Sequence, residues 1–321
     1  LLEKAIISAE KNFGPDHPTT AASYSNLALV FKALGDYHGA KELLERVAEL
    51  SEKNFGSDHP NTAVSYSNLA GVLQVLGDYN GAKELFEKSI KSAEKNFGSD
   101  HPMAAGNYAN LAVVLQSLGD YYGAKELLEK ATKSDEKNFG PDHPTTAVHY
   151  SNLALVLKNL GDYHGAKELL EKAIKSDEKN FGPDHPTTAV HYSNLALVLP
   201  ALGDYHGAKE LLEKAMKSAE KNFGPDHPTT ATSYSNLALV LQALRDYPRA
   251  KKLFKKAKIS TEKNFGFDHP TTAVHYSNLA NLLRDLGDYQ GAIELLDKAI
   301  KICDQKLGKK HPNTLKIKQN L

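Results

Sequence analysis

The sequence predicts an all-α fold built as a solenoid of tandem helical hairpins. One tyrosine recurs every 42 residues and is always followed two positions later by Asn-Leu. The recurring residues are Tyr24, Tyr66, Tyr108, Tyr150, Tyr192, Tyr234 and Tyr276. Within each period, apolar residues fall at helical spacing in two blocks separated by a short turn sequence. Helical units that repeat in this way stack on their neighbours, so we expect a single array over residues 1–321.

The array is expected to begin inside a unit. Residues 1–13 match the end of a period and are predicted to form a partial second helix, with a connector up to residue 17. Seven complete hairpins are predicted at residues 18–59, 60–101, 102–143, 144–185, 186–227, 228–269 and 270–311. Residues 312–321 should form a partial or capping helix. Because the chain begins in mid-unit and without a methionine, we expect it to be a segment of a longer protein.

Each hairpin carries its own start and stop signals. The first helix of one unit contains Tyr24, Leu27, Ala28, Phe31 and Leu34, and the second contains Ala40, Leu43, Leu44, Val47 and Leu50. Gly35 suits the left-handed turn that ends the first helix, and Asp36 can cap the second by accepting hydrogen bonds from its free amides. Pro60 opens the next unit and fits a first helical turn, where its missing N–H is harmless.

Composition argues against several classes of partner. Lys plus Arg equals Asp plus Glu at 39 each, which removes the long-range attraction that nucleic acids and anionic membranes require. No apolar run approaches the roughly 20 residues needed to span a bilayer, and no signal-peptide pattern opens the chain. Cys303 is the only cysteine, so no intrachain disulfide can form. We therefore expect a soluble, cytoplasmic protein with neither a nucleic acid nor a membrane as its partner.

The recurring residues resemble the tetratricopeptide repeat, with Tyr24, Leu27 and Ala28 before the Gly35-Asp36-Tyr37 turn and Ala40 after it. The usual unit has about 34 residues, and the longer unit here resembles the repeats of kinesin light chain. This resemblance implies a right-handed superhelix with first helices inside and second helices outside. It also implies a protein or peptide partner, held in an extended or short helical form in the concave groove that the first helices line.

A second patterned face on the first helices gives the candidate site. Opposite the core stripe lies one asparagine per unit: Asn26, Asn68, Asn110, Asn152, Asn194, Asn236 and Asn278. Units four to six form the uniform middle of the array and are the expected contact region, where Ser151, Ser193 and Ser235 and the apolar Leu155, Leu197 and Leu239 run beside the asparagines. An asparagine offers both a donor and an acceptor, as an extended peptide backbone requires. In similar repeats an asparagine at this position often contacts a bound peptide, and the resemblance implies the same role here.

Other interpretations stay open at this point. The asparagines and serines could instead bond neighbouring helices, with the leucines packed between adjacent first helices. The array could also be structural and self-associate weakly through its ends, because Leu1, Leu2, Ala5 and Ile6 lack a preceding partner helix. Arrays that resemble this one are often the sensor segment of larger signalling proteins with an NTPase or protease domain, which is a third possibility.

Metal binding and catalysis are not expected. The connector histidines recur once per unit, about 10 Å apart by helix packing, whereas a Zn–N bond is about 2.0 Å long. These are His17, His59, His101, His143, His185, His227, His269 and His311, and we assign them to connector structure. No unit contains a unique nucleophile, base and stabiliser, so we expect a protein that is not an enzyme and has no cofactor.

Three departures from the repeat stand out. The sixth unit is basic, with Arg245, Arg249, Lys251, Lys252, Lys255, Lys256, Lys258 and Lys263 against Asp226, Asp246 and Glu262. These cations form either a solvated face or a docking surface for an acidic partner. Pro200 lies late in a first helix, where a proline is predicted to bend or end it. Arg245 replaces the turn glycine that the other units carry.

Overall fold

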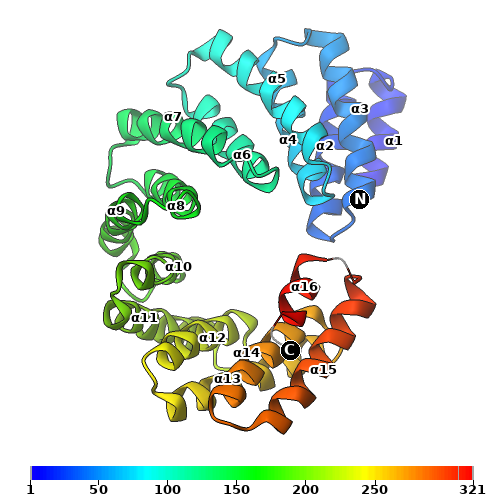
Figure 1. Ribbon diagram of the computed structural model, residues 1–321. Helices are drawn as coiled ribbons and strands as arrows, with labels where there is room; N and C mark the ends of the chain where they lie inside the picture. The colour runs from blue at the N-terminus through cyan, green and yellow to red at the C-terminus, as the bar shows by residue number, and fades with distance from the viewer. Residues whose placement is uncertain (1, 310, 320–321) are drawn as a thin grey trace. The chain divides into compact units, whose positions relative to one another are not determined.

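The computed structural model describes residues 2–309 and 311–319, and within them every regular element is a helix. The first helices and the second helices alternate along the chain, with one 3-10 helix, η1 (Figure 1). The elements are α1 (Leu2–Phe13), α2 (Pro18–Ala33), α3 (Tyr37–Phe55), α4 (Pro60–Val75), α5 (Tyr79–Phe97), α6 (Pro102–Ser117), α7 (Tyr121–Phe139), α8 (Pro144–Asn159), α9 (Tyr163–Phe181), α10 (Pro186–Ala196), η1 (Leu199–Leu202), α11 (Tyr205–Phe223), α12 (Pro228–Ala243), α13 (Tyr247–Phe265), α14 (Pro270–Asp285), α15 (Tyr289–Lys306) and α16 (Pro312–Lys318). The predicted all-α hairpin solenoid is confirmed.

The chain divides into two compact units, Leu1–Asp162 and Tyr163–Leu321. The first contains α1 to α8 and the second contains α9 to α16. Within each unit, every helix packs against the next one along the chain, as expected of a repeat array. Leu1 lies outside the described residues, as do the side chains of Leu2 and Ala5, so most of the predicted exposed end is not described.

The turn within each hairpin follows the predicted chemistry. Gly35 has a φ of 80°, the left-handed conformation that ends α2, and Asp36 Oδ1 accepts a hydrogen bond of 2.9 Å from the Gly39 amide. The same arrangement recurs, except that Arg245 takes the glycine position with a φ of 61°. It is the one non-glycine residue with a positive φ in the part of the chain that the structure describes.

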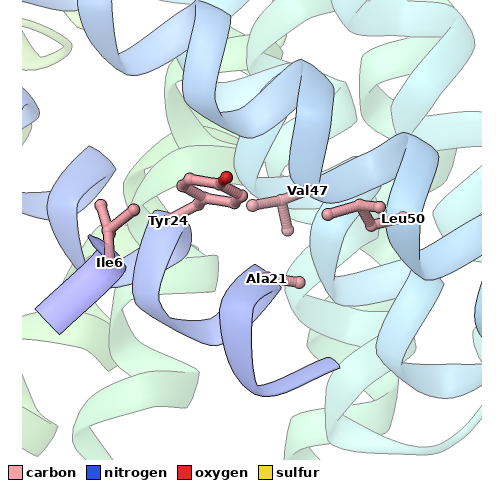
Figure 2. Close-up of a cluster of buried hydrophobic side chains, with 5 residues drawn as sticks. All are labelled: Ile6, Ala21, Tyr24, Val47 and Leu50. Atoms are coloured by element: carbon pink, nitrogen blue, oxygen red, sulfur yellow. The ribbon is translucent and has the colours of Figure 1, made fainter. Parts of the chain in front are cut away.

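The core lies between first and second helices. In the first unit of the array, Ile6 of α1, Ala21 and Tyr24 of α2, and Val47 and Leu50 of α3 form one buried cluster (Figure 2). Three consecutive helices meet in this cluster, so the apolar core of this hairpin also includes the helix that precedes it. The hydroxyl of the recurring tyrosine reaches the edge of the core, where it donates to a glutamate fourteen positions earlier, as Tyr276 does to Glu262 at 2.7 Å.

Pro200 ends a helix early, as the sequence predicts. The helix α10 stops at Ala196, whereas α12 runs for 16 residues. Because Pro200 has no N–H, it cannot donate to Ala196, and the chain tightens into η1, in which the Ala201 amide donates to the Val198 carbonyl at 3.1 Å.

Candidate peptide-binding groove

The row of seven asparagines lies on the seven first helices, one on each. Asn26 and Asn110 are exposed, and the other five are partly buried. On α14, Asn278 donates from Nδ2 to Ser235 Oγ of α12 over 3.1 Å, which is a bond between neighbouring first helices. At this position the row therefore has a structural role of the kind that the alternative interpretation describes.

Two of the three predicted serines lie deeper than a ligand contact requires, because Ser151 and Ser235 are each only 4% exposed. Ser193 is partly buried and donates its hydroxyl to the carbonyl of Ala189 over 2.9 Å, within its own helix. The asparagines beside these serines therefore carry most of the polar part of the predicted site.

The three predicted leucines divide by exposure. Leu197 and Leu239 are 49% and 46% exposed, and Leu155 is partly buried. Two large apolar side chains on adjacent first helices, α10 and α12, are therefore available to a ligand in the second compact unit.

A hollow of about 310 Å³ lies between α10, α11 and α12 and brings several predicted residues together. Its wall includes Ser193, Asn194, Leu197 and Asn236. A second hollow of about 210 Å³ also has Leu197 and Asn236 in its wall, together with Leu239 and Pro200. The predicted site residues of α10 and α12 thus line two neighbouring hollows that share Leu197 and Asn236 in their walls.

Sequence reasoning missed two apolar residues of the larger hollow. Val190 of α10 and Phe223 at the end of α11 both line it, and both are exposed. The sequence held a signal that could have found them. Apolar residues recur at the positions of Val190 and Phe223 in most units, although these positions lie outside the core stripe of the helices. The corresponding hollow of the first compact unit, between α2 and α4, is about 160 Å³ and includes no residue of the asparagine row.

Seven of the connector histidines cap the first helices. His17 Nδ1 accepts from the Thr19 amide at 3.1 Å, and its ring stacks on Phe13 with centroids 5.0 Å apart. The same cap and stack recur at His59, His101, His143, His185, His227 and His269. Their assignment to connector structure is confirmed. Among the described residues, no group of three or more His, Cys, Asp or Glu is placed to hold a metal ion.

Two further histidines pair with aspartates inside the core. His149 Nδ1 lies 3.0 Å from Asp135 Oδ2, and His191 Nδ1 lies 3.0 Å from Asp177 Oδ2. Burial lowers the pKa of His149 and raises the pKa of Asp135, because both charged forms lose water on folding. Each pair lies between a second helix and the first helix of the next repeat, and neither pair lines the hollow.

Family models for the tetratricopeptide repeat match most of the chain. The matched segments are residues 1–53, 25–95, 61–137, 103–179, 145–221, 187–258 and 272–313. The chain belongs to the tetratricopeptide repeat family. Arrays of this repeat are protein-interaction scaffolds, and this is the general function that membership gives the chain.

Solved structures agree with this assignment. The nearly identical TPR-like repeats of a kinesin light chain-like protein from Podosopora anserina are 30% identical over 64% of this chain and 98% of theirs, with a TM-score of 0.58. The apo quorum sensor NprR from B. thuringiensis is 15% identical over 94% of this chain and 80% of its own, with a TM-score of 0.71. A STAND protein with a tetratricopeptide repeat sensor, from Pyrococcus horikoshii, is 18% identical over 93% of this chain and 43% of its own, with a TM-score of 0.67.

The last two likenesses show the tetratricopeptide fold alone. No curated protein matches the chain significantly in sequence. No described helix of this tetratricopeptide array has the length and apolar character needed to cross a lipid bilayer.

Proposed function

We propose that this array binds an extended peptide segment of another protein along its first helices, with the main contact on α10 and α12. The observation that carries the proposal is the larger hollow, whose wall includes Asn194, Asn236 and the exposed Leu197. Polar groups that can bond a peptide backbone and an apolar surface that can receive a side chain occur there together.

The chemistry of the hollow suits a peptide better than a small metabolite. Its volume of about 310 Å³ is at the lower end of the range for small-molecule sites, about 300–1,000 Å³, and it is open to solvent along the helices. Val190, Leu197 and Phe223 provide apolar wall, so one or two side chains of a ligand could be buried there. The amides of Asn194 and Asn236 would then pair with the backbone on either side.

The second candidate is a sensor role for the same groove within a larger signalling protein. The Pyrococcus horikoshii relative is described as having a tetratricopeptide repeat sensor, and NprR is described as a quorum sensor. In this version of the proposal the peptide is a signal, and its binding site is unchanged. A cytoplasmic location is part of either version, with Cys303 present as a buried free thiol.

The test is peptide selection followed by a matched pair of variants. Peptides selected from a displayed random library against the whole chain would be labelled and their Kd values measured by fluorescence polarisation. Asn194→Ala with Asn236→Ala should weaken binding about tenfold, because each lost hydrogen bond contributes about 0.5–1.5 kcal/mol. Asn80→Ala with Asn159→Ala makes the same chemical change at exposed positions on α5 and α8, outside both the asparagine row and the hollow, and should leave the Kd nearly unchanged.

Two results would contradict the proposal. Selected peptides that bind the Asn194 and Asn236 variant as tightly as the parent would place recognition elsewhere on the surface. An absence of any selected peptide, combined with a mass in sedimentation equilibrium that rises with protein concentration, would favour the self-associating structural array.

A further inference from the structure

The second helix of the sixth unit differs in charge from its counterparts. α13 carries seven Lys or Arg residues and one acidic residue, Glu262. By comparison, α5 and α11 each carry four basic and three acidic residues. The whole chain has no net charge, so the excess of positive charge on α13 is a local feature of the surface and not a property of the whole protein.

Substitutions at two exposed positions produce most of the excess. Lys252 and Lys255 stand where α11 has Glu210 and Glu213. In other second helices the second of these acids pairs with a lysine one turn earlier, as Glu45 does with Lys41 at 3.5 Å. In α13 that pair is replaced by two lysines, Lys251 and Lys255, which repel each other. An unfavourable arrangement of this kind is relieved by an anionic partner.

The remaining cations of α13 already have partners. Arg249 lies 2.9 Å from Glu213, Lys256 lies 3.6 Å from Glu220, and Lys263 pairs with Asp226. Lys251, Lys252 and Lys255 have no ion-pair partner among the described residues, and Lys252 and Lys255 are exposed. These three lysines are therefore available to bind acidic groups from outside the chain.

A hollow of about 440 Å³ continues this surface between α13 and α15. Its wall includes Lys258 of α13 and Lys298 and Lys301 of α15, the last two exposed and without an ion-pair partner among the described residues. Lys258 stands where α11 has the apolar Met216, so the sixth unit has a cation at a position that is apolar in the fifth unit. Its Nζ lies 5.7 Å above the ring of Tyr276, which lines the hollow, and 3.5 Å from Glu262.

The hollow also has an apolar side. Leu295 and Ile302 of α15 line it, and Phe267 stands at its rim with 67% of its surface exposed. The other connectors carry Pro, Ser or, in the last one, Lys309 at the position of Phe267, so this aromatic ring is specific to the sixth unit. The corresponding hollow between α5 and α7 includes Glu87, where the sixth unit has Lys255.

We propose that the outer surface of α13 and α15 docks an acidic segment of a partner protein that carries one aromatic or aliphatic side chain. The acidic groups pair with Lys252, Lys255 and Lys298, and the apolar side chain enters the hollow beside Phe267. A nucleic acid or an anionic membrane fits less well, because Glu262 and Asp268 interrupt the positive surface and half of the hollow is apolar. The surface lies on second helices and is separate from the groove of α10 and α12.

The experiment uses the whole chain and a labelled synthetic peptide of Glu and Asp residues around one central Phe. Its affinity is measured by fluorescence polarisation for the parent and for Lys252→Glu with Lys255→Glu, which restores the acids of the other units. The expected result is a Kd about tenfold weaker in this variant, and binding that weakens with added salt. Lys175→Glu with Lys217→Glu makes the same charge change at exposed, unpaired positions on α9 and α11 and should leave the Kd unchanged.

The apolar part is tested by a thermodynamic cycle. Phe267→Ser should weaken the Phe peptide several-fold and should not alter binding of the same peptide with Ala at its centre. Equal weakening of both peptides would remove the apolar contact from the proposal. The docking surface itself would be overturned if the parent did not bind the peptide, if the α9 and α11 control lost as much affinity, or if only single-stranded RNA or phosphatidylserine vesicles bound.

Discussion

His191 and Asp177 form a buried pair between α9 and α10, with Nδ1 and Oδ2 3.0 Å apart and only 4% and 1% of the side chains exposed. Neither carboxylate oxygen of Asp177 accepts a hydrogen bond of normal geometry from the described residues. Burial therefore raises the pKa of Asp177 to about 6 and lowers the pKa of His191 to about 4.

These two pKa shifts have opposite effects on stability. The raised pKa of Asp177 contributes to the free energy of unfolding; this contribution is complete below the unfolded pKa of 3.8 and is lost as the pH rises through about 6. The contribution of His191 is complete above its unfolded pKa of 6.5 and is lost as the pH falls through about 4. Because the two windows overlap, the pair leaves the free energy of unfolding nearly independent of pH between them.

Removing the acid from the pair should make the protein more acid-sensitive than the parent. In Asp177→Asn only the shift of the His191 pKa remains, so the melting temperature should fall more steeply than in the parent as the pH drops from 6.5 to 4. Melting curves by circular dichroism across that range measure the slope. Asp177→Ala with His191→Ser reproduces the pair Ala219 and Ser233 of the next unit and should restore the slope of the parent. Parallel profiles for the parent and Asp177→Asn would contradict the assigned pKa values.

His275 should already cause acid sensitivity in the parent. Its counterpart to Asp177 is Thr261, and burial lowers the His275 pKa to about 4 without an acid to compensate. Its contribution to stability is complete above pH 6.5 and is lost as the pH falls through 4. His275→Ser should flatten the melting profile in this window, and an unchanged slope would mean that the histidine is protonated in the folded protein without cost.

Arg245→Gly should stabilise the array. Arg245 has a φ of 61°, and an ordinary side chain in this left-handed conformation costs about 1 kcal/mol relative to glycine. Urea unfolding should show a gain of that size, detected at the midpoint with an unchanged m-value. Gly119→Arg makes the opposite change at a φ of 83° and should lower the free energy of unfolding by a similar amount. A loss of stability in Arg245→Gly would show that the arginine side chain makes a contact worth more than the strain.

The fold was predictable because its signals are local. Gly35, Asp36 and Pro60 fix the ends of helices through their own backbone chemistry, and the 42-residue period repeats those signals along the chain. Even the early end of α10 follows from one residue, Pro200, because the missing N–H and the ring clash act within a single turn.

The candidate site was only partly predictable, because the burial of each side chain depends on how closely the neighbouring helices approach. A helical wheel places Ser235 and Asn236 on one face, yet Ser235 is buried and accepts from Asn278 of the next first helix, whereas Asn236 lines the hollow. In each buried pair, His149 with Asp135 and His191 with Asp177, the two partners are fourteen residues apart in the sequence. Comparing units could have found them, since the histidine and the acid enter the repeat together at these two places.

Pro200→Gln should lengthen α10 and partly close the smaller hollow, which Pro200 lines. Gln242 occupies this position in α12, which continues to Ala243, whereas α10 ends at Ala196. A proline in a helix interior costs about 3 kcal/mol, part of which η1 already relieves, so the expected gain in the free energy of unfolding is about 1–2 kcal/mol.

The structural consequence distinguishes this prediction from simple stabilisation. A crystal structure of Pro200→Gln should show backbone hydrogen bonds of the α type through residues 197–201, and the hollow of about 210 Å³ that Pro200 now lines should shrink. Peptides that depend on Leu239 for affinity should then bind more weakly, while contacts in the larger hollow persist because Pro200 is not in its wall. The converse variant, Gln242→Pro, should shorten α12 and lower the melting temperature. If Pro200→Gln left α10 ending at Ala196, the cause of its early end would lie in the packing around Val198 and Leu199, both of which are buried.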